Sequence, residues 1–135
     1  YSFTKKDTFS DRLLIFLFHF AFFLRNFKNN QEKQILQELY DYIFKQLEIS
    51  IREIGYGDAS INKKMKSYVN SLYLILKKID KWENLSLSEK NSIFNNLLDY
   101  SDDSSFLSEY FDKYLIFLQN NFFNLFVNGV INTKI

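Results

Sequence analysis

The sequence contains no cysteine, no proline, three glycines and one histidine among its 135 residues. Without cysteine the chain forms no disulfide and offers neither a thiolate ligand nor a cysteine nucleophile. With His19 as its one histidine, most histidine-based catalysis and metal binding are excluded too. Because proline is absent and glycine is rare, almost nothing interrupts a helix. These absences favour a helical domain with little equipment for catalysis, and we predict that the chain is not an enzyme.

The chain also has no large excess of positive or negative charge. It contains 17 Lys and Arg and 16 Asp and Glu, which gives a net charge of +1. Nucleic-acid-binding domains normally carry a clear basic excess, so we predict no nucleic-acid partner. The hydrophobic fraction of 47% and the charged fraction of 24% are typical of a folded globular chain. A chain of 135 residues has the size of one domain. We predict a single domain over residues 1–135.

Aromatic residues are abundant, at 19% of the chain with 16 Phe and 9 Tyr. They are densest between Leu13 and Leu24, a run that is apolar on every side and is bounded by Arg12 and Arg25. The run is shorter than the roughly 20 residues that a membrane-spanning helix needs. A helix that is apolar all round is usually the central helix of a bundle. We expect that position here, with a membrane-contacting surface as the alternative.

Apolar residues recur at steps of three and four, which predicts four further helices. The expected ranges are about 32–54, about 59–80, a helix opened by the capping box Ser86–Glu89, and about 105–127. Between the second and third helices, Gly55 suits a left-handed residue that ends a helix and Asp58 suits an N-cap. The predicted fold class is all-α, a single bundle-like domain of about five helices.

Two features of the sequence are candidate metal sites, namely His19 and a cluster of three aspartates. His19 is either a haem or metal ligand or, as we favour, a core residue with one hydrogen-bonded nitrogen, because no second ligand stands at a matching spacing. Asp99, Asp102 and Asp103 have the oxygen chemistry that a hard cation prefers. Their spacing matches no calcium loop, and we favour a role as helix caps. We therefore predict no metal and no cofactor.

The Gly-Tyr-Gly-Asp connector at residues 55–58 is similar to a shortened phosphate loop, and Lys63, Lys64 and Lys66 follow it. A phosphate loop usually follows a strand and carries more glycine. The residues alone therefore predict a tight turn between two helices.

The segment from Ile51 to Ile61, with Arg-Glu-Ile-Gly-Tyr-Gly-Asp at residues 52–58, resembles the signature of the ubiquinol–cytochrome c chaperone family. A basic pair and a Met follow it, as they do in the family. Further positions that fit the family pattern are Arg12, His19, Leu39, Asp41, Phe44, Tyr73 and Asn96. The chain departs from the pattern at Leu74 and Ile75, where the family has Gly-Arg, and at Asn95, where it has Arg. The resemblance covers roughly residues 8–100.

The resemblance implies a helical assembly factor for respiratory complex III that binds newly made cytochrome b and works by binding and release. It implies a small helical partner chaperone, contact with a membrane surface, and a place in the bacterial cytoplasm at the inner membrane, or else on the matrix side of the mitochondrial inner membrane. The residues expected to bind partners are Arg52, Glu53, Asp58, Lys63, Lys64 and Lys66, while Gly55 and Gly57 are expected to shape the turn.

Two other functions compete with this one. The first is a helical adaptor or membrane-surface module with a different client, and the second is a helical enzyme that uses Asp99, Asp102 and Asp103 with a divalent metal. The surplus of Phe and Tyr does not separate these functions, because aromatic residues supply either an exposed apolar groove or a filled core.

Overall fold

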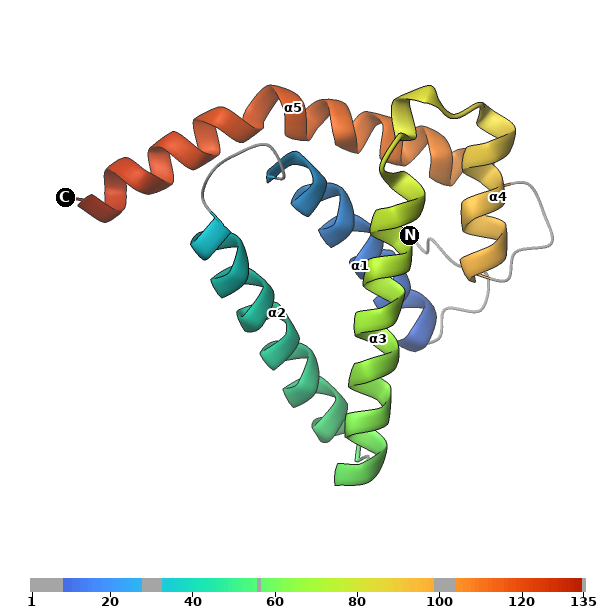
Figure 1. Ribbon diagram of the computed structural model, residues 1–135, viewed down its shortest axis with the longest axis vertical. Coiled ribbons are helices and arrows are strands. Elements are labelled where there is room, and N and C mark those ends of the chain that lie inside the picture. The colour runs from blue at the N-terminus through green and yellow to red at the C-terminus, as the bar shows by residue number, and fades with distance from the viewer. Residues whose placement is uncertain (1–8, 28–32, 56, 99–103, 135) are drawn as a thin grey trace.

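The computed structural model describes residues 9–27, 33–55, 57–98 and 104–134, with the side chains of the last helix described as far as residue 120. Within these residues the chain forms five α-helices and one short 3-10 helix, and no strand (Figure 1). The elements are α1 (Phe9–Phe27), α2 (Lys33–Ile54), α3 (Asp58–Ile79), η1 (Trp82–Asn84), α4 (Leu87–Leu98) and α5 (Ser105–Lys134). The predicted all-α, bundle-like class is confirmed.

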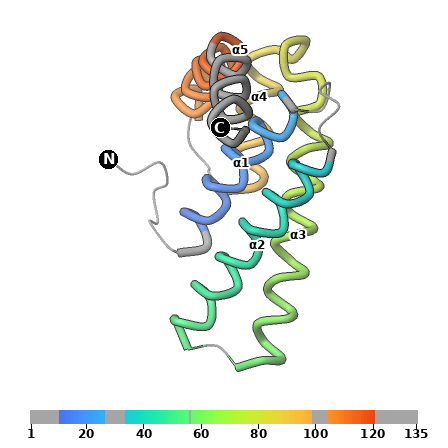
Figure 2. Tube along the Cα trace, turned by 90° about the vertical axis from the view of Figure 1, so that its left-hand side faces the viewer, coloured from blue at the N-terminus to red at the C-terminus, as the bar shows by residue number. Residues whose placement is uncertain are grey.

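Helix α1 packs against α3, α4 and α5, while α2 packs on α3. Helices α2 and α3 form an antiparallel hairpin whose turn lies at one end of the long axis, while α5 crosses near the opposite end (Figures 1 and 2). Because its neighbours lie on several sides, α1 is apolar all round, as predicted for a central helix. Its buried residues are Leu13, Ile15, Leu17, Phe18, Phe20, Ala21 and Phe22. The exception is Phe16, which is 42% exposed.

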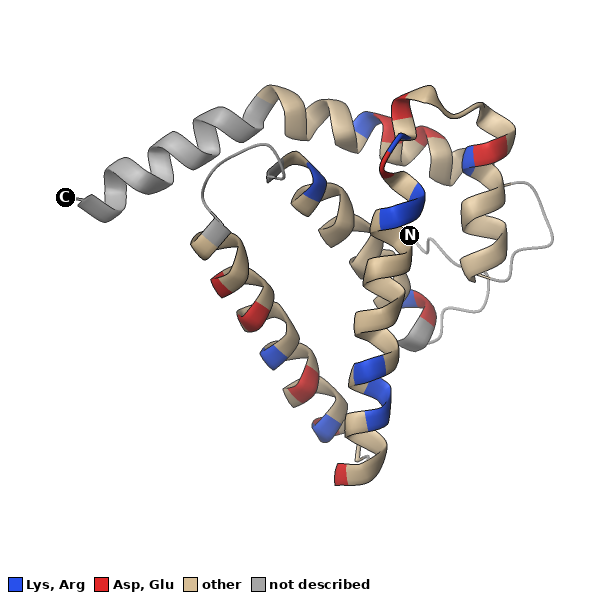
Figure 3. Ribbon diagram, viewed as in Figure 1, with Lys and Arg blue, Asp and Glu red and all other residues tan. Residues whose placement is uncertain are grey.

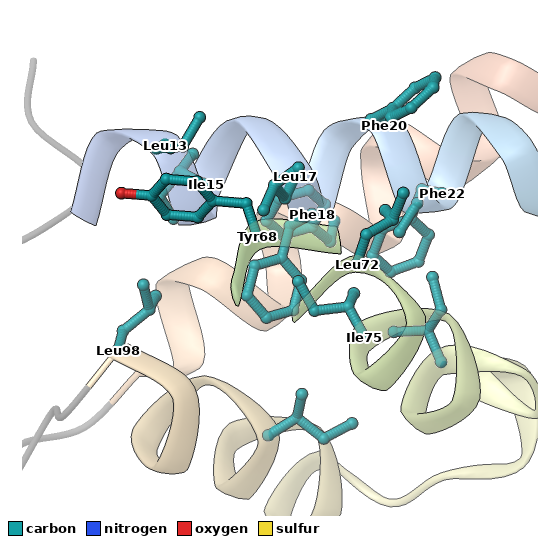
Figure 4. Packing of buried hydrophobic residues seen from close by; sticks show 14 of the residues in the cluster. Leu13, Ile15, Leu17, Phe18, Phe20, Phe22, Tyr68, Leu72, Ile75 and Leu98 are labelled. Atoms are coloured by element: carbon teal, nitrogen blue, oxygen red, sulfur yellow. The ribbon is translucent and has the colours of Figure 1, made fainter. Parts of the chain in front are cut away.

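Aromatic rings fill the centre of the core. The ring of Phe111 in α5 stacks on Phe22 with centroids 5.0 Å apart and on Phe94 at 5.5 Å. Phe18 lies 5.8 Å from the same ring. Figure 4 shows Phe18 and Phe22 of α1 beside Leu72 of α3, so aliphatic side chains complete the packing. Much of the phenylalanine surplus therefore fills the core.

Trp82 lies in η1, a short helix that sequence reasoning did not predict. Its side chain is 1% exposed, and its Nε1–H donates to Asp112 Oδ1 at 2.8 Å. Lys90 Nζ donates to the same oxygen at 2.9 Å and lies 4.9 Å from the centre of the Trp82 ring. This cluster ties the connection between α3 and α4 to α5.

The capping box at the start of α4 is confirmed. The Ser86 backbone N–H donates to Glu89 Oε1 at 3.0 Å, and the Glu89 N–H donates to Ser86 Oγ at 3.2 Å. Together these bonds satisfy two backbone donors that the helix itself leaves open. Hydrogen bonding from the Ser86 backbone N–H, and then from the Ser86 side chain, lowers the pKa of the Glu89 carboxyl, because the charged form is the better acceptor.

Other boundaries differ from the predictions. Asp58 is not the N-cap of α3; Gly57 is, with φ −73° and ψ 163°, and Asp58 is the first helical residue. The three- and four-residue period of apolar residues in α2 includes Ile54, but this side chain is 51% exposed because the hairpin turn projects beyond the core, and Phe44 is buried. Helix α5 runs past the predicted end at Val127 to Lys134. Gly129 lies within it, since one glycine costs a helix only about 1 kcal/mol.

Candidate functional site at the α2–α3 corner

An arginine joins the two helices at the hairpin turn. Arg52, in the last turn of α2, donates from Nη1 to Asp58 Oδ1 at 2.6 Å and from Nη2 to Glu48 Oε1 at 3.1 Å. The hydrogen bond from Asp58, and then that from Glu48, raise the pKa of Arg52. Asp58 thus closes the corner through its side chain instead of capping α3. Because these groups face water, the pairs fix geometry more than they add stability.

Of the two glycines in the turn, Gly55 and Gly57, only Gly55 has a backbone conformation that favours glycine. Gly55 has φ +105°, in the left-handed region, and its N–H donates to the Arg52 carbonyl oxygen at 3.0 Å. Gly57 is extended, and its carbonyl oxygen accepts the Ile61 N–H at 2.9 Å. The predicted role of Gly55 is therefore confirmed in its backbone conformation.

Replacing Gly55 with valine should lower the free energy of unfolding by about 1–3 kcal/mol, because a β-branched residue is strained at positive φ. Gly57→Val is the matched control, since no atom lies within 4 Å of a Cβ at either position and Gly57 has an ordinary φ. Urea unfolding followed by circular dichroism measures both. Equal midpoints for the two variants would contradict the strained conformation at Gly55.

The six predicted partner-binding residues fall into two groups. Arg52 and Asp58 pair with each other, and Glu53 is exposed beside them. The lysines lie further along α3, where Lys63 and Lys66 are exposed and Lys64 is half-buried. Within the predicted set, the structure pairs Arg52 with Asp58 and brings Lys63 and Lys66 together at one hollow on α3. Tyr56, in the same motif, lies outside the described residues.

His19 is held by hydrogen bonds at both ring nitrogens. Its Nδ1–H donates to the Ile15 carbonyl oxygen at 2.8 Å, and Nε2 accepts the Tyr110 hydroxyl at 2.6 Å in the neutral ring. The sequence indicated one bonded nitrogen, and no local pattern could indicate the second partner, Tyr110, which stands 91 positions away. Among the residues with described side chains, no three His, Cys, Asp or Glu gather as a metal site. Asp99, Asp102 and Asp103 lie outside the described residues.

Burial lowers the pKa of His19, and the hydrogen bond to Ile15 opposes this only partly. The folded chain therefore binds this proton less readily than the unfolded chain, whose histidine pKa is about 6.5. Stability should be full above that pH and should fall as the pH drops below it. Melting temperatures of the wild type at about pH 7.5 and about pH 5.5 test this. In the variant His19→Gln, the melting temperature should fall less between these two pH values than it does in the wild type. An identical loss in both proteins would contradict it.

Apolar side chains also reach the surface on each of the five α-helices. Phe16 of α1 is exposed, as are Phe106, Ile116 and Phe117 of α5. On α2 the exposed apolar residues are Ile35, Tyr42, Ile49 and Ile54. The aromatic surplus thus serves both of the expected purposes, because it fills the core and also leaves large apolar side chains in contact with water.

A hollow of about 260 Å³ opens where α1, α2 and α3 meet. It is lined by Leu24, Leu36, Gln37, Tyr40 and Tyr73. Burial and a hydrogen bond with Tyr73 raise the pKa of Tyr40 to about 12, so its hydroxyl stays protonated at physiological pH. The lining offers apolar contact with phenolic hydroxyls and an amide, which suits binding of a protein segment more than bond chemistry.

The protein is all-helical in the described part of the chain. Its charged α2–α3 corner and its exposed apolar side chains are surfaces suited to binding other molecules. The sequence profile described as ubiquinol-cytochrome C chaperone matches residues 2–88, more than half of the chain. The chain therefore belongs to the ubiquinol–cytochrome c chaperone family. The match includes α1, α2, α3 and all six predicted partner-binding residues. No curated protein and no solved structure matches the chain.

Membership implies the role of an assembly chaperone for respiratory complex III that acts on a protein client. The family's role is associated with a membrane. None of the described helices has the length and hydropathy to cross a bilayer.

Proposed function

We propose that the chain binds newly made cytochrome b and holds it while ubiquinol–cytochrome c reductase is assembled. The observation that carries this proposal is the family match across α1 to α3, the helices that bear the corner and the apolar hollow. A client that is itself a membrane protein presents apolar helices. Exposed aromatic and aliphatic side chains are the chemistry that binds such surfaces.

The polar residues at the corner complete this function. Arg52, Glu53 and Asp58 form a rim around the turn, and Lys63, Lys64 and Lys66 follow on α3. Polar rims set orientation and partner choice, while buried apolar contacts supply most of the affinity. We propose that this rim contacts the client, a small helical partner chaperone and the membrane surface. The chain then acts at the inner membrane, on the bacterial cytoplasmic side or, alternatively, on the mitochondrial matrix side.

Affinity purification of the tagged chain from detergent-solubilised membranes of the source organism tests this function. Cytochrome b, identified by mass spectrometry, should co-purify with the chain above the level found with an unrelated tagged protein. Recovery of other membrane proteins without cytochrome b would overturn the proposal and would favour the helical adaptor with a different client.

The charge reversal Lys63→Glu with Lys64→Glu should weaken capture of cytochrome b from native membranes while leaving the melting temperature nearly unchanged. Lys63 is exposed and Lys64 is half-buried, and charges at a protein surface steer association more than they stabilise a fold. The loss should be greatest at low ionic strength, where the field of these residues is least screened. Capture equal to that of the wild type at low salt would remove both lysines from the proposed surface.

A further inference from the structure

The outward face of α3 carries lysines toward both ends of the helix and no acidic residue between them. From Ala59 to Ile79 the helix carries five lysines and no Asp or Glu. The residues buried against the core are Ile61, Tyr68, Leu72, Ile75 and Ile79. By helical period, Lys63, Lys66 and Lys77 lie on the opposite side, and all three are exposed. Figure 3 shows blue at both ends of α3 with no red between them.

These charges are not neutralised within the described part of the chain. Lys63, Lys66 and Lys77 form no ion pair there, whereas Arg25, Arg52 and Lys90 each hold a carboxylate within 4 Å. The whole chain has a net charge of only +1, so the excess is local to this face. An uncompensated basic face attracts an anionic partner.

The same face contains a shallow hollow of about 360 Å³. It is lined by Lys63, Lys66, Ser67, Asn70, Ser71 and Leu74. Two ammonium groups, two hydroxyls and an amide supply hydrogen-bond donors, and the lining contains no carboxylate. This is the donor chemistry that binds a phosphate oxygen.

Apolar side chains stand among the lysines. Leu74, at the edge of the hollow, is 42% exposed, and the neighbouring Tyr73 is 58% exposed. Lysine with tyrosine and leucine is the mixture found at the interface of a bilayer, where ammonium groups meet headgroup phosphates and apolar groups enter the boundary region. Nucleic acid or an acidic protein segment would match the lysines but not an exposed leucine in their midst.

We propose that the outward face of α3 docks on a membrane surface rich in anionic phospholipid, with a lipid phosphate in the hollow between Lys63 and Lys66. Leu74 and Tyr73 then lie at the headgroup boundary. This inference deepens the proposed function and rests on it only for the setting at a membrane, because lipid binding is measured without any client.

Co-sedimentation of the purified chain with lipid vesicles tests the inference. The chain should bind vesicles of equal parts phosphatidylcholine and phosphatidylglycerol at least about tenfold more tightly than vesicles of phosphatidylcholine alone, and added salt should weaken the binding. Lys63→Glu with Lys66→Glu should lose at least about tenfold of that affinity. Leu74→Ser should weaken binding without changing its dependence on salt.

A matched control distinguishes an effect of this face on vesicle binding from an effect of the net charge of the chain. Lys45→Glu with Lys113→Glu changes the charge by the same amount on α2 and α5, where both lysines are exposed. That variant should keep most of the binding, and circular dichroism should show both double variants folded. Equal losses in the two variants, or no preference for anionic vesicles, would overturn the inference.

Preference for poly-glutamate or RNA over anionic vesicles would also overturn it, and would assign the face to an acidic protein or a nucleic acid. Inorganic phosphate that displaces the chain from vesicles at millimolar concentration would mean a free-phosphate site and would contradict membrane docking. Vesicle binding without capture of cytochrome b would remove only the proposed function. Capture from detergent without vesicle binding would remove only this inference.

Discussion

Replacing Phe111 with alanine should lower the free energy of unfolding by about 3–5 kcal/mol, the range for a buried aromatic truncated in a core. The ring is fully buried and stacks on Phe22 and Phe94. It also lies 4.9 Å from the His19 ring, so its loss opens a cavity that borders three helices. Small domains have about 5–15 kcal/mol of stability in all. The variant should therefore lose a large share of the stability of the fold.

Urea unfolding followed by circular dichroism measures this loss. The control is Ile116→Ala on the same helix, whose side chain is 55% exposed and whose truncation should cost less than about 1 kcal/mol. If the two variants lost the same stability, α5 would not pack on α1 and α4 through Phe111.

Replacing Trp82 with alanine should cost a similar amount, about 3–5 kcal/mol. The side chain packs edge-on to Phe22 with ring centroids 5.1 Å apart, and its Nε1–H is bonded to Asp112. Truncation removes this contact and leaves Lys90 without the ring beneath its ammonium group. The link between the α3–α4 connection and α5 is then lost.

Trp82→Phe separates packing from hydrogen bonding, because it keeps a ring but has no donor for Asp112. It should cost about 1–3 kcal/mol, the range for a lost buried hydrogen bond and some volume. Thermal unfolding followed by circular dichroism suits both variants, since each lacks the single Trp fluorophore of the chain. A phenylalanine variant as unstable as the alanine variant would show that the bond to Asp112 dominates over the ring contacts.

Local patterns predicted most of the helices. The apolar run around residues 13–24 and the three- and four-residue periodicity placed α1 to α4, and the capping box placed the start of α4. These signals are local because a helix is stabilised by neighbours in the chain. The bond between His19 and Tyr110 and the bond between Trp82 and Asp112 span 91 and 30 positions, so no local pattern indicated them.

The sequence indicated the motif at the candidate site but not how its side chains are arranged. The motif between Arg52 and Asp58 gave the family and the left-handed Gly55. It did not indicate that Asp58 would bond Arg52 instead of capping α3, because a carboxylate at a helix start suits either role. Nor did spacing after the motif reveal that Lys66 and Lys77 share one exposed face, which depends on where the core of α3 lies.

The most direct measurement of the central claim is the amount of assembled ubiquinol–cytochrome c reductase in cells of the source organism that lack this chain. The b-type haem signal in a reduced-minus-oxidised difference spectrum of their membranes reports it. An assembly chaperone for cytochrome b predicts that this signal falls and that the wild-type gene restores it. A b-type haem signal and an enzyme content unchanged by the deletion would contradict the claim.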